Sequence, residues 1–127
     1  MRFAVLAHTL PNWSGDRPDH WDLLIGVPGR DLRAWRLADP LMVSGWRRID
    51  PLPPHRAAYL FLEGSTRRGQ GWVRRVAEGE ARLWCDDRTA FRATLRAADF
   101  SGLIDLASTA AGWRRCFTAA VARKETP

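Results

Sequence analysis

Hydrophobic and polar positions alternate in short runs along most of the chain, as they do in β-strands. Side chains two residues apart in a strand share one face, and in residues 20–27 His20, Asp22 and Leu24 alternate with Trp21, Leu23 and Ile25. Gly, Pro, Asn and Asp separate these runs, which is typical of all-β domains. We therefore expect strands at 2–8, 20–27, 32–38, 55–63, 72–77, 81–85, 91–96, 100–106 and 113–121.

The connections define the predicted fold more closely. Residues 20–38 are expected to form a hairpin around Pro28-Gly29, and Glu78-Gly79 is expected to turn a second hairpin. Residues 39–54 contain four prolines and predict an irregular segment with a short strand near 46–49, and residues 64–71 predict a basic, glycine-rich loop. A helix over 89–98 is the alternative to a strand there, but Phe91, Ala93 and Leu95 alternate with polar residues and favour the strand.

The sequence thus predicts an all-β fold: one small, closed or nearly closed β-barrel of about eight strands. Closure would remove the exposed edges of the sheet. Residues 1–121 would form the barrel domain, and residues 122–127 a disordered tail.

Composition and charge place this domain in a broad class. The chain has 127 residues and a net charge of +6, with a pI of about 10.9, which favours a polyanionic partner such as nucleic acid. Nineteen of its 20 basic residues are arginine, and that usage can also reflect a GC-rich coding sequence. The N-terminus does not look like a signal peptide, and no apolar run reaches the ~18 residues of a membrane span. We expect a cytoplasmic protein, a monomer with no membrane partner.

Cysteine and tryptophan add two expectations. Cys85 and Cys116 form no Cys-x-x-Cys motif, which argues against a zinc knuckle or a disulfide framework. Among the seven tryptophans, Trp13 and Trp46 lie in predicted loops and could stack on bases. The tryptophans expected on strands are assigned to core packing: Trp35, Trp72, Trp84 and Trp113.

The three histidines of the chain, His8, His20 and His55, are the main candidates for chemistry. His8 ends the first predicted strand and His20 opens the second, so antiparallel pairing would bring His8 near His20 and Asp22. Two imidazoles and a carboxylate at one end of a barrel suit a divalent transition metal. The alternative is a group of hydrogen-bonded polar residues at a strand end.

Two classes of metal site fit these residues. His20 and Asp22 with His55 would form the facial triad of non-haem iron oxygenases. The same pair with His8 would suit manganese or zinc in phosphoester hydrolysis. The chemistry of the residues alone leaves both open.

The order of several short motifs resembles the 3′-phosphoesterase domain of bacterial DNA ligase D, in its compact, stand-alone form. Arg2-Phe3-Ala4-Val5 leads to His8, and His20-Trp21-Asp22-Leu23 follows, as in that family's first two strands. Leu32-Arg33-Ala34-Trp35 matches its Leu-x-x-Trp strand. Later matches are His55 with Tyr59, Leu62-Glu63-Gly64, Gly69-Gln70-Gly71 and the strand that begins at Trp113.

The resemblance implies a β-barrel that removes a 3′-phosphate or a terminal ribonucleoside from DNA or RNA 3′ ends, with end-joining repair proteins as further partners. It implies a divalent metal, manganese before zinc or another transition metal, held by His8, His20 and Asp22. It assigns His55 and Tyr59 to the scissile phosphate and Arg47 to phosphate binding.

Two positions depart from the family pattern, because Leu24 and Gly26 stand where the family has an arginine and a glutamate. That difference keeps a non-catalytic nucleic-acid-binding barrel open as an alternative. A non-haem iron oxygenase is the third hypothesis, and so short a chain leaves little room for its cosubstrate-binding elements.

Overall fold

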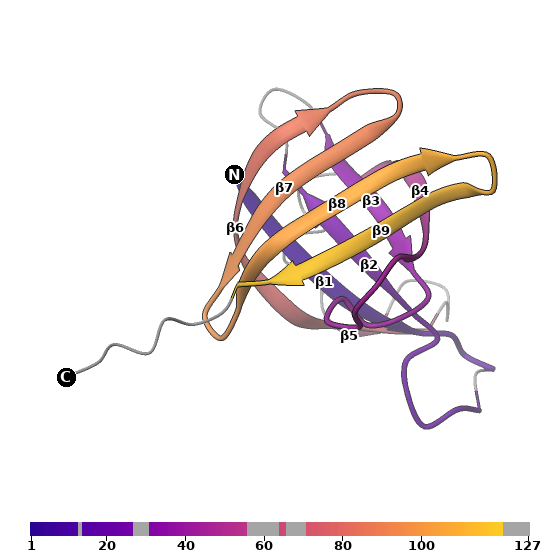
Figure 1. Cartoon of the computed structure of the whole chain (residues 1–127). Helices are drawn as coiled ribbons and strands as arrows, with labels where there is room; N and C mark the ends of the chain where they lie inside the picture. Colours follow the sequence, from indigo (N-terminus) through magenta and orange to yellow (C-terminus); the bar gives the residue numbers. More distant parts are fainter. Residues whose placement is uncertain (13, 27–30, 56–63, 66–70, 121–127) are drawn as a thin grey trace.

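The computed structural model describes residues 1–12, 14–26, 31–55, 64–65 and 71–120. This part of the chain contains nine β-strands and no helix (Figure 1). The strands are β1 (Arg2–Thr9), β2 (His20–Ile25), β3 (Leu32–Leu37), β4 (Arg47–His55), β5 (Gly64–Ser65), β6 (Trp72–Asp86), β7 (Ala90–Ala97), β8 (Ser101–Thr109) and β9 (Gly112–Ala119). In particular, the segment from 89 to 98 is the predicted strand and not a helix.

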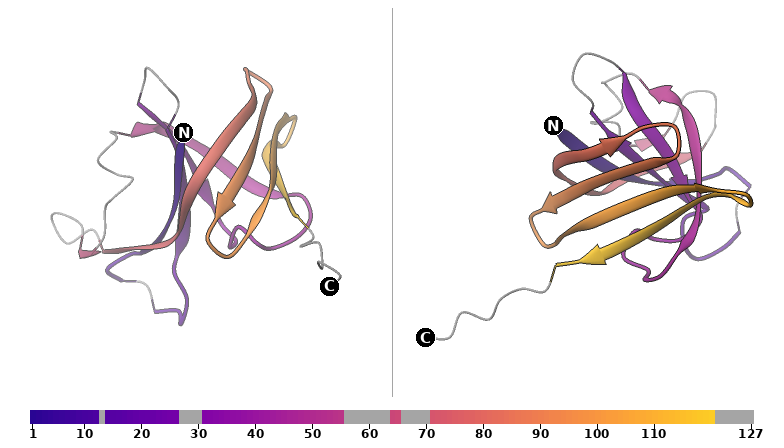
Figure 2. Two further views of the ribbon diagram at one scale, coloured as in Figure 1. Left: turned by 90° about the vertical axis from the view of Figure 1, so that its left-hand side faces the viewer. Right: turned by 45° about the horizontal axis from the view of Figure 1, so that its top comes forward.

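Eight of the strands close into an antiparallel barrel. The sheet order is β1-β2-β3-β4-β9-β8-β7-β6-β5, and an additional pairing of β1 with β6 joins the two ends. Within the described residues, the short strand β5 pairs with the start of β6 and with no other strand. Figures 1 and 2 show the half formed by β6 to β9 crossing over the half formed by β1 to β4. The predicted all-β barrel is confirmed.

The barrel interior is filled by the inward-facing residues of all the long strands. Trp35 packs against Phe91 and Trp113, and Phe100 packs against Phe3 and Phe117. Full burial of each such side chain contributes roughly 1.5–3 kcal/mol. A second apolar cluster lies on the other face of β1, β2, β3 and β6 and consists of Ala4, Leu6, Leu24, Leu32, Ala34 and Val73. Burial on both faces explains why residues 3–7 are apolar without interruption.

The predicted hairpin at Glu78-Gly79 is wrong, because β6 runs unbroken from Trp72 to Asp86. Gly79 pairs with Ala97 of the neighbouring strand β7, and a Cβ atom there would lie 1.9 Å from the carbonyl oxygen of Arg96. The glycine therefore permits a close approach within a long strand and does not turn the chain.

The prediction that residues 39–54 are largely irregular is also wrong over its second half. β4 extends to His55 through Pro51, Pro53 and Pro54. On one side β4 pairs with β3, but its pairing with β9 covers only Arg47 and Arg48. Beyond those two pairs the described chain gives β4 no second neighbour, and prolines are tolerated there because their missing N–H groups are not needed.

The segment between β3 and β4 is held by a buried arginine of β9. Arg115 is fully buried, and its guanidinium donates hydrogen bonds to the carbonyl oxygens of Pro40, Leu41 and Val43 at 2.8, 2.9 and 3.0 Å. Burial lowers the pKa of this guanidinium, although arginine still stays protonated. Sequence patterning did not distinguish Arg115 from the exposed arginines.

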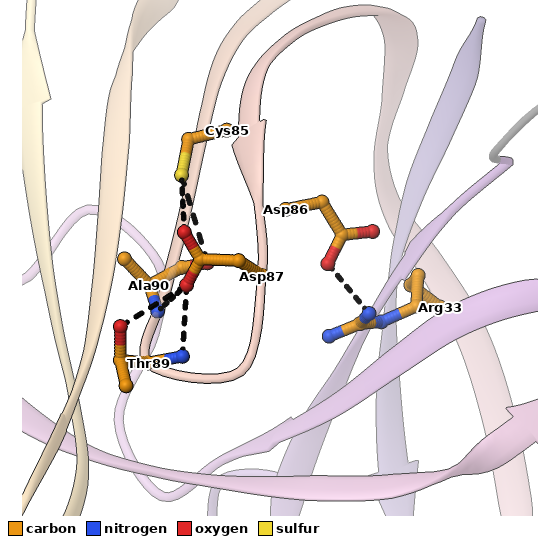
Figure 3. Close-up of polar contacts among 6 residues, drawn as sticks. All are labelled: Arg33, Cys85, Asp86, Asp87, Thr89 and Ala90. Atoms are coloured by element: carbon orange, nitrogen blue, oxygen red, sulfur yellow. Dashed lines mark hydrogen bonds and ion pairs between the residues drawn. The ribbon is translucent and has the colours of Figure 1, made fainter.

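Polar contacts also order the tight turn between β6 and β7 (Figure 3). The Asp87 carboxylate accepts hydrogen bonds from the backbone N–H groups of Thr89 and Ala90, at 2.9 and 3.0 Å, and from the Cys85 thiol. Donors around Asp87, first the Thr89 N–H, lower its pKa. The hydrogen bond to Asp87 raises the pKa of the Cys85 thiol.

Several predictions fall outside the described residues: most of the strand expected at 55–63, Tyr59, Trp13, most of the 64–71 loop, and the tail at 122–127. Within the described chain, no helix is long and apolar enough to span a membrane.

Candidate metal centre

The pairing of β1 with β2 builds a cluster of three side chains on the outer surface of the barrel. His8 lies directly opposite His20 in the register. Their neighbours Ala7 and Trp21 belong to the interior core, so alternation puts both histidines and Asp22 on the outer face. The potential ligand atoms of His8, His20 and Asp22 all lie within 4.8 Å of one another. The expected convergence of these three residues is confirmed.

The proton of His20 is fixed by the residue that precedes it. His20 is only 5% exposed, and its Nδ1 lies 2.8 Å from Oδ2 of Asp19. Because an ionised carboxylate can only accept, Nδ1 carries the proton and Nε2 presents a lone pair. A carboxylate on the far nitrogen is the usual way to orient a metal-binding imidazole. Asp19 was not among the predicted site residues.

The lone pair of His20 Nε2 points into the cluster. His8 Nδ1 lies 2.9 Å from it, and Asp22 Oδ1 lies 3.6 Å from it. Asp22 Oδ1 is buried and has no hydrogen-bond partner. Without an ion, the Nδ1–H of His8 donates to the lone pair of His20 Nε2, and the Asp22 oxygen is the acceptor that a shared cation would satisfy.

These separations fit a divalent metal. Ligand atoms held at ~2.1 Å by one ion lie about 3.0–3.4 Å apart, depending on the coordination angle. The observed 2.9 and 3.6 Å bracket that range. His8 and Asp22 are only half-buried, so an ion there would be reached from solvent and would keep positions for water or substrate.

Arg36 is the arginine that the register places beside the cluster. It lies opposite Asp22 in the pairing of β2 with β3, and its Nε is 3.9 Å from Asp22 Oδ1. Its side chain is 47% exposed, so the guanidinium borders both the cluster and the solvent. The predicted 20–38 hairpin already contained this pairing, because a turn centred near residue 29 sets residue 36 opposite residue 22.

The other two described candidates lie elsewhere. Arg47 pairs with the inward-facing Arg115 and donates its Nε to the carbonyl oxygen of Ser44, so register puts it on the opposite face of the sheet from the cluster. His55 pairs with Leu32, four residues along β3 from Arg36, which is roughly 13 Å of strand. Its Nδ1 lies 2.7 Å from the carbonyl oxygen of Pro53. Tyr59 lies outside the described residues.

A hollow of about 490 Å³ lies at the same end of β1 as the cluster, but none of the three cluster residues lines it, and its lining residue Ala7 faces the interior. Its lining includes Ala7 and Thr9, the chain neighbours of His8, and Pro18, which precedes the Asp19-His20 pair. Arg17, Trp72 and Arg74 complete the side that faces solvent. An aromatic ring and two guanidinium groups in one hollow can accept a nucleoside and its phosphate.

The fold and the cluster define the class: a closed antiparallel β-barrel with a candidate divalent-metal site on its outer surface. Comparison of the chain with protein-family models and with curated proteins finds no match to either.

Proposed function

We propose that this barrel is a metal-dependent phosphoesterase that processes the 3′ ends of nucleic acids, removing a 3′-phosphate or a terminal ribonucleoside. The single observation that supports this most is the His8–His20–Asp22 cluster, with its unsatisfied carboxylate oxygen and its oriented imidazole. The net charge of +6 supports a polyanionic substrate, and the motif order that resembles the ligase D domain supports the reaction.

In this proposal His8, His20 and Asp22 hold one divalent ion, with manganese as the first choice. Such an ion polarises a phosphate oxygen and lowers the pKa of a bound water. His20 is held for this task by Asp19, which keeps the lone pair of Nε2 directed at the ion. The third ligand is His8, and the geometry does not bring His55 to the cluster, which disfavours the iron-oxygenase arrangement.

Arg36 supplies the positive charge for the phosphate in this arrangement. Its guanidinium lies at the solvent side of Asp22, where it can bind the oxygens on which charge develops. The family pattern assigns that task to Arg47, and a role for His55 and Tyr59 at the scissile phosphate stays a prediction from the resemblance. We place Arg36 first because its Nε lies 3.9 Å from Asp22 Oδ1.

The test is release of phosphate from an oligonucleotide with a 3′-phosphate, measured with manganese added and with EDTA. We expect metal-dependent release by the wild type and near-complete loss in His8→Ala. Arg36→Ala should lose about 100-fold in kcat. Its metal affinity should change less than about fivefold, because an exposed ion pair such as Arg36–Asp22 contributes at most ~1 kcal/mol.

The matched control is Asp99→Asn, which removes an exposed carboxylate in the bend between β7 and β8, outside the cluster. This variant should retain full activity. Metal binding without any phosphate release, by a folded wild type on both DNA and RNA ends, would refute the catalytic proposal and leave the non-catalytic nucleic-acid-binding barrel.

A further inference from the structure

Three tryptophans of the described chain are exposed, and the prediction that two of them, Trp72 and Trp84, pack in the core is wrong. Trp84 of β6 is 54% exposed, and Trp46, which directly precedes β4, is 58% exposed. Both line one hollow of about 440 Å³ on the outside of the barrel. Large aromatic surface left in water at a hollow is a common mark of a binding site. We call this hollow the tryptophan groove.

The groove runs across β6, β7 and β8, three strands that lie side by side in Figure 1. Ala90 and Ala107, which pair across β7 and β8, contribute small side chains to its lining. Arg92 and Asp105 pair with each other in the same lining. In the closed ring of eight strands β8 is four positions from β2, so the groove lies on the other side of the barrel from the metal cluster.

Trp84 is held as a fixed platform. Its indole N–H donates a hydrogen bond to Thr94 Oγ1 at 2.7 Å, which sets the plane of the ring. The guanidinium of Arg82 lies over the ring, 4.4 Å from its centroid. An ordered ring with a cation on it loses little side-chain freedom when a planar ligand stacks beside it.

The charges around the groove favour an anionic occupant. Arg114 of β9 lies opposite Ala107 on one side and opposite Arg48 of β4 on the other. In the described part of the chain neither Arg82 nor Arg114 forms an ion pair with a carboxylate, whereas Arg92 is neutralised by Asp105. Two uncompensated guanidinium groups therefore border the aromatic walls.

We propose that the tryptophan groove is a second binding site of this protein, and that its occupant is single-stranded nucleic acid. Bases stack on Trp46 and Trp84, and the phosphates between them contact Arg82 and Arg114. Aromatic walls with a basic rim are how proteins bind single strands without reading sequence. The site takes the same class of ligand as the proposed function, but it depends on none of the metal ligands.

The test is fluorescence anisotropy of a labelled dT12 strand with a 3′-hydroxyl end, titrated with the full chain in EDTA. No metal is bound and nothing can be hydrolysed under these conditions. We expect the double variant Trp46→Ala/Trp84→Ala to bind at least about tenfold more weakly, as loss of two stacking contacts implies. Arg114→Gln should reduce the salt dependence of binding, because one phosphate contact is lost.

Conservative and distant variants keep the result interpretable. Trp84→Phe retains a stacking ring and should retain most of the affinity. Val76→Ala, at an exposed apolar residue of β6 outside the groove lining, should bind as the wild type does. A thermal melt of each variant establishes that it is folded.

Unchanged affinity of the folded double variant would overturn the proposal. So would quenching of tryptophan fluorescence by a proline-rich peptide and not by dT12, which would identify a protein partner. The proposed function is tested by different variants and a different readout. Loss of phosphate release in His8→Ala says nothing about dT12 binding. Loss of dT12 binding in the double variant leaves release from a short 3′-phosphate substrate intact.

Discussion

Asp19 has the clearest single-residue effect that the structure predicts. It holds the Nδ1 proton of His20 from a position 2.8 Å away, and it is not itself in the ligand set. Asp19→Ala should therefore weaken manganese binding by about 10–100-fold, the usual cost of losing a partner that orients a ligand. Isothermal titration with manganese measures this, and His8→Ala should lose more.

The control for Asp19 is again Asp99→Asn, whose manganese affinity should match that of the wild type. An Asp19→Ala variant with unchanged affinity, despite native stability, would show that His20 is not a ligand through Nε2.

A second effect at the residue scale concerns the thiol of Cys85. Its hydrogen bond to the Asp87 carboxylate raises its pKa, because the negative charge and the hydrogen bond both favour the protonated thiol. Since the thiolate is the reactive form, Asp87→Asn should make Cys85 alkylate faster at pH 8. Mass spectrometry after iodoacetamide treatment measures the rate, with Cys116 as the internal reference.

The hydrogen bonds to Asp87 also determine how the stability of the fold changes with pH. Hydrogen bonds to Asp87 lower its pKa in the folded state, so its stabilising contribution is complete above the unfolded-state value near ~4 and is lost as the pH falls through the folded-state value. The wild type should thus lose more stability between pH 5 and pH 2 than Asp87→Asn does. Urea denaturation across that range measures the difference, and parallel curves would contradict the assignment.

At the scale of the elements, the pairing of β6 with β7 requires a position without a side chain. At Gly79 a Cβ atom would lie 1.9 Å from a backbone oxygen of β7, and neither strand can move without disturbing the barrel. Gly79→Ala should therefore destabilise the fold by at least about 2 kcal/mol. Gly26→Ala is the matched control, because its nearest atoms would lie 3.5 Å away, and urea denaturation of the two variants should separate them clearly.

Gly79 also shows where element prediction from sequence succeeds and where it fails. Alternation located the cores of most strands correctly, because one face of each strand is buried. It could not distinguish a glycine in a tight turn from a glycine inside a strand, where a neighbouring strand comes too close for a side chain. In the same way, prolines at 51, 53 and 54 indicate irregular chain until it is known that, among the described residues, β4 has no second neighbour there.

The functional candidates and the buried arginine also divide into residues that the sequence could predict and residues that it could not. His8, His20 and Asp22 could be grouped from sequence because they depend on one local strand pairing. Arg115 could not be distinguished, since its partners are backbone carbonyls of a segment more than 70 residues away. The exposure of Trp84 escaped prediction because it depends on which residues of β6, β7 and β8 lie around it.

At the scale of the whole molecule, a bound ion should stabilise the entire barrel. The cluster joins β1 to β2, and β1 also closes the ring through its pairing with β6. A ligand that binds only the folded state raises the free energy of unfolding by RT ln(1 + [L]/Kd). This increase is about 2.7 kcal/mol when the ligand concentration is 100 times Kd. For a domain of this size that amount corresponds to a rise in Tm of roughly 8 °C.

Calorimetry with increasing manganese therefore tests occupancy of the site without any substrate. The rise in Tm should be concentration-dependent in the wild type and in Arg36→Ala, because Arg36 is not a ligand, and it should vanish in His8→Ala. A rise that persists in His8→Ala would place the ion elsewhere on the barrel. The Arg36→Ala variant then separates metal binding from catalysis, which an activity assay alone cannot do. Manganese should stabilise this variant as it does the wild type, but the variant should release phosphate far more slowly.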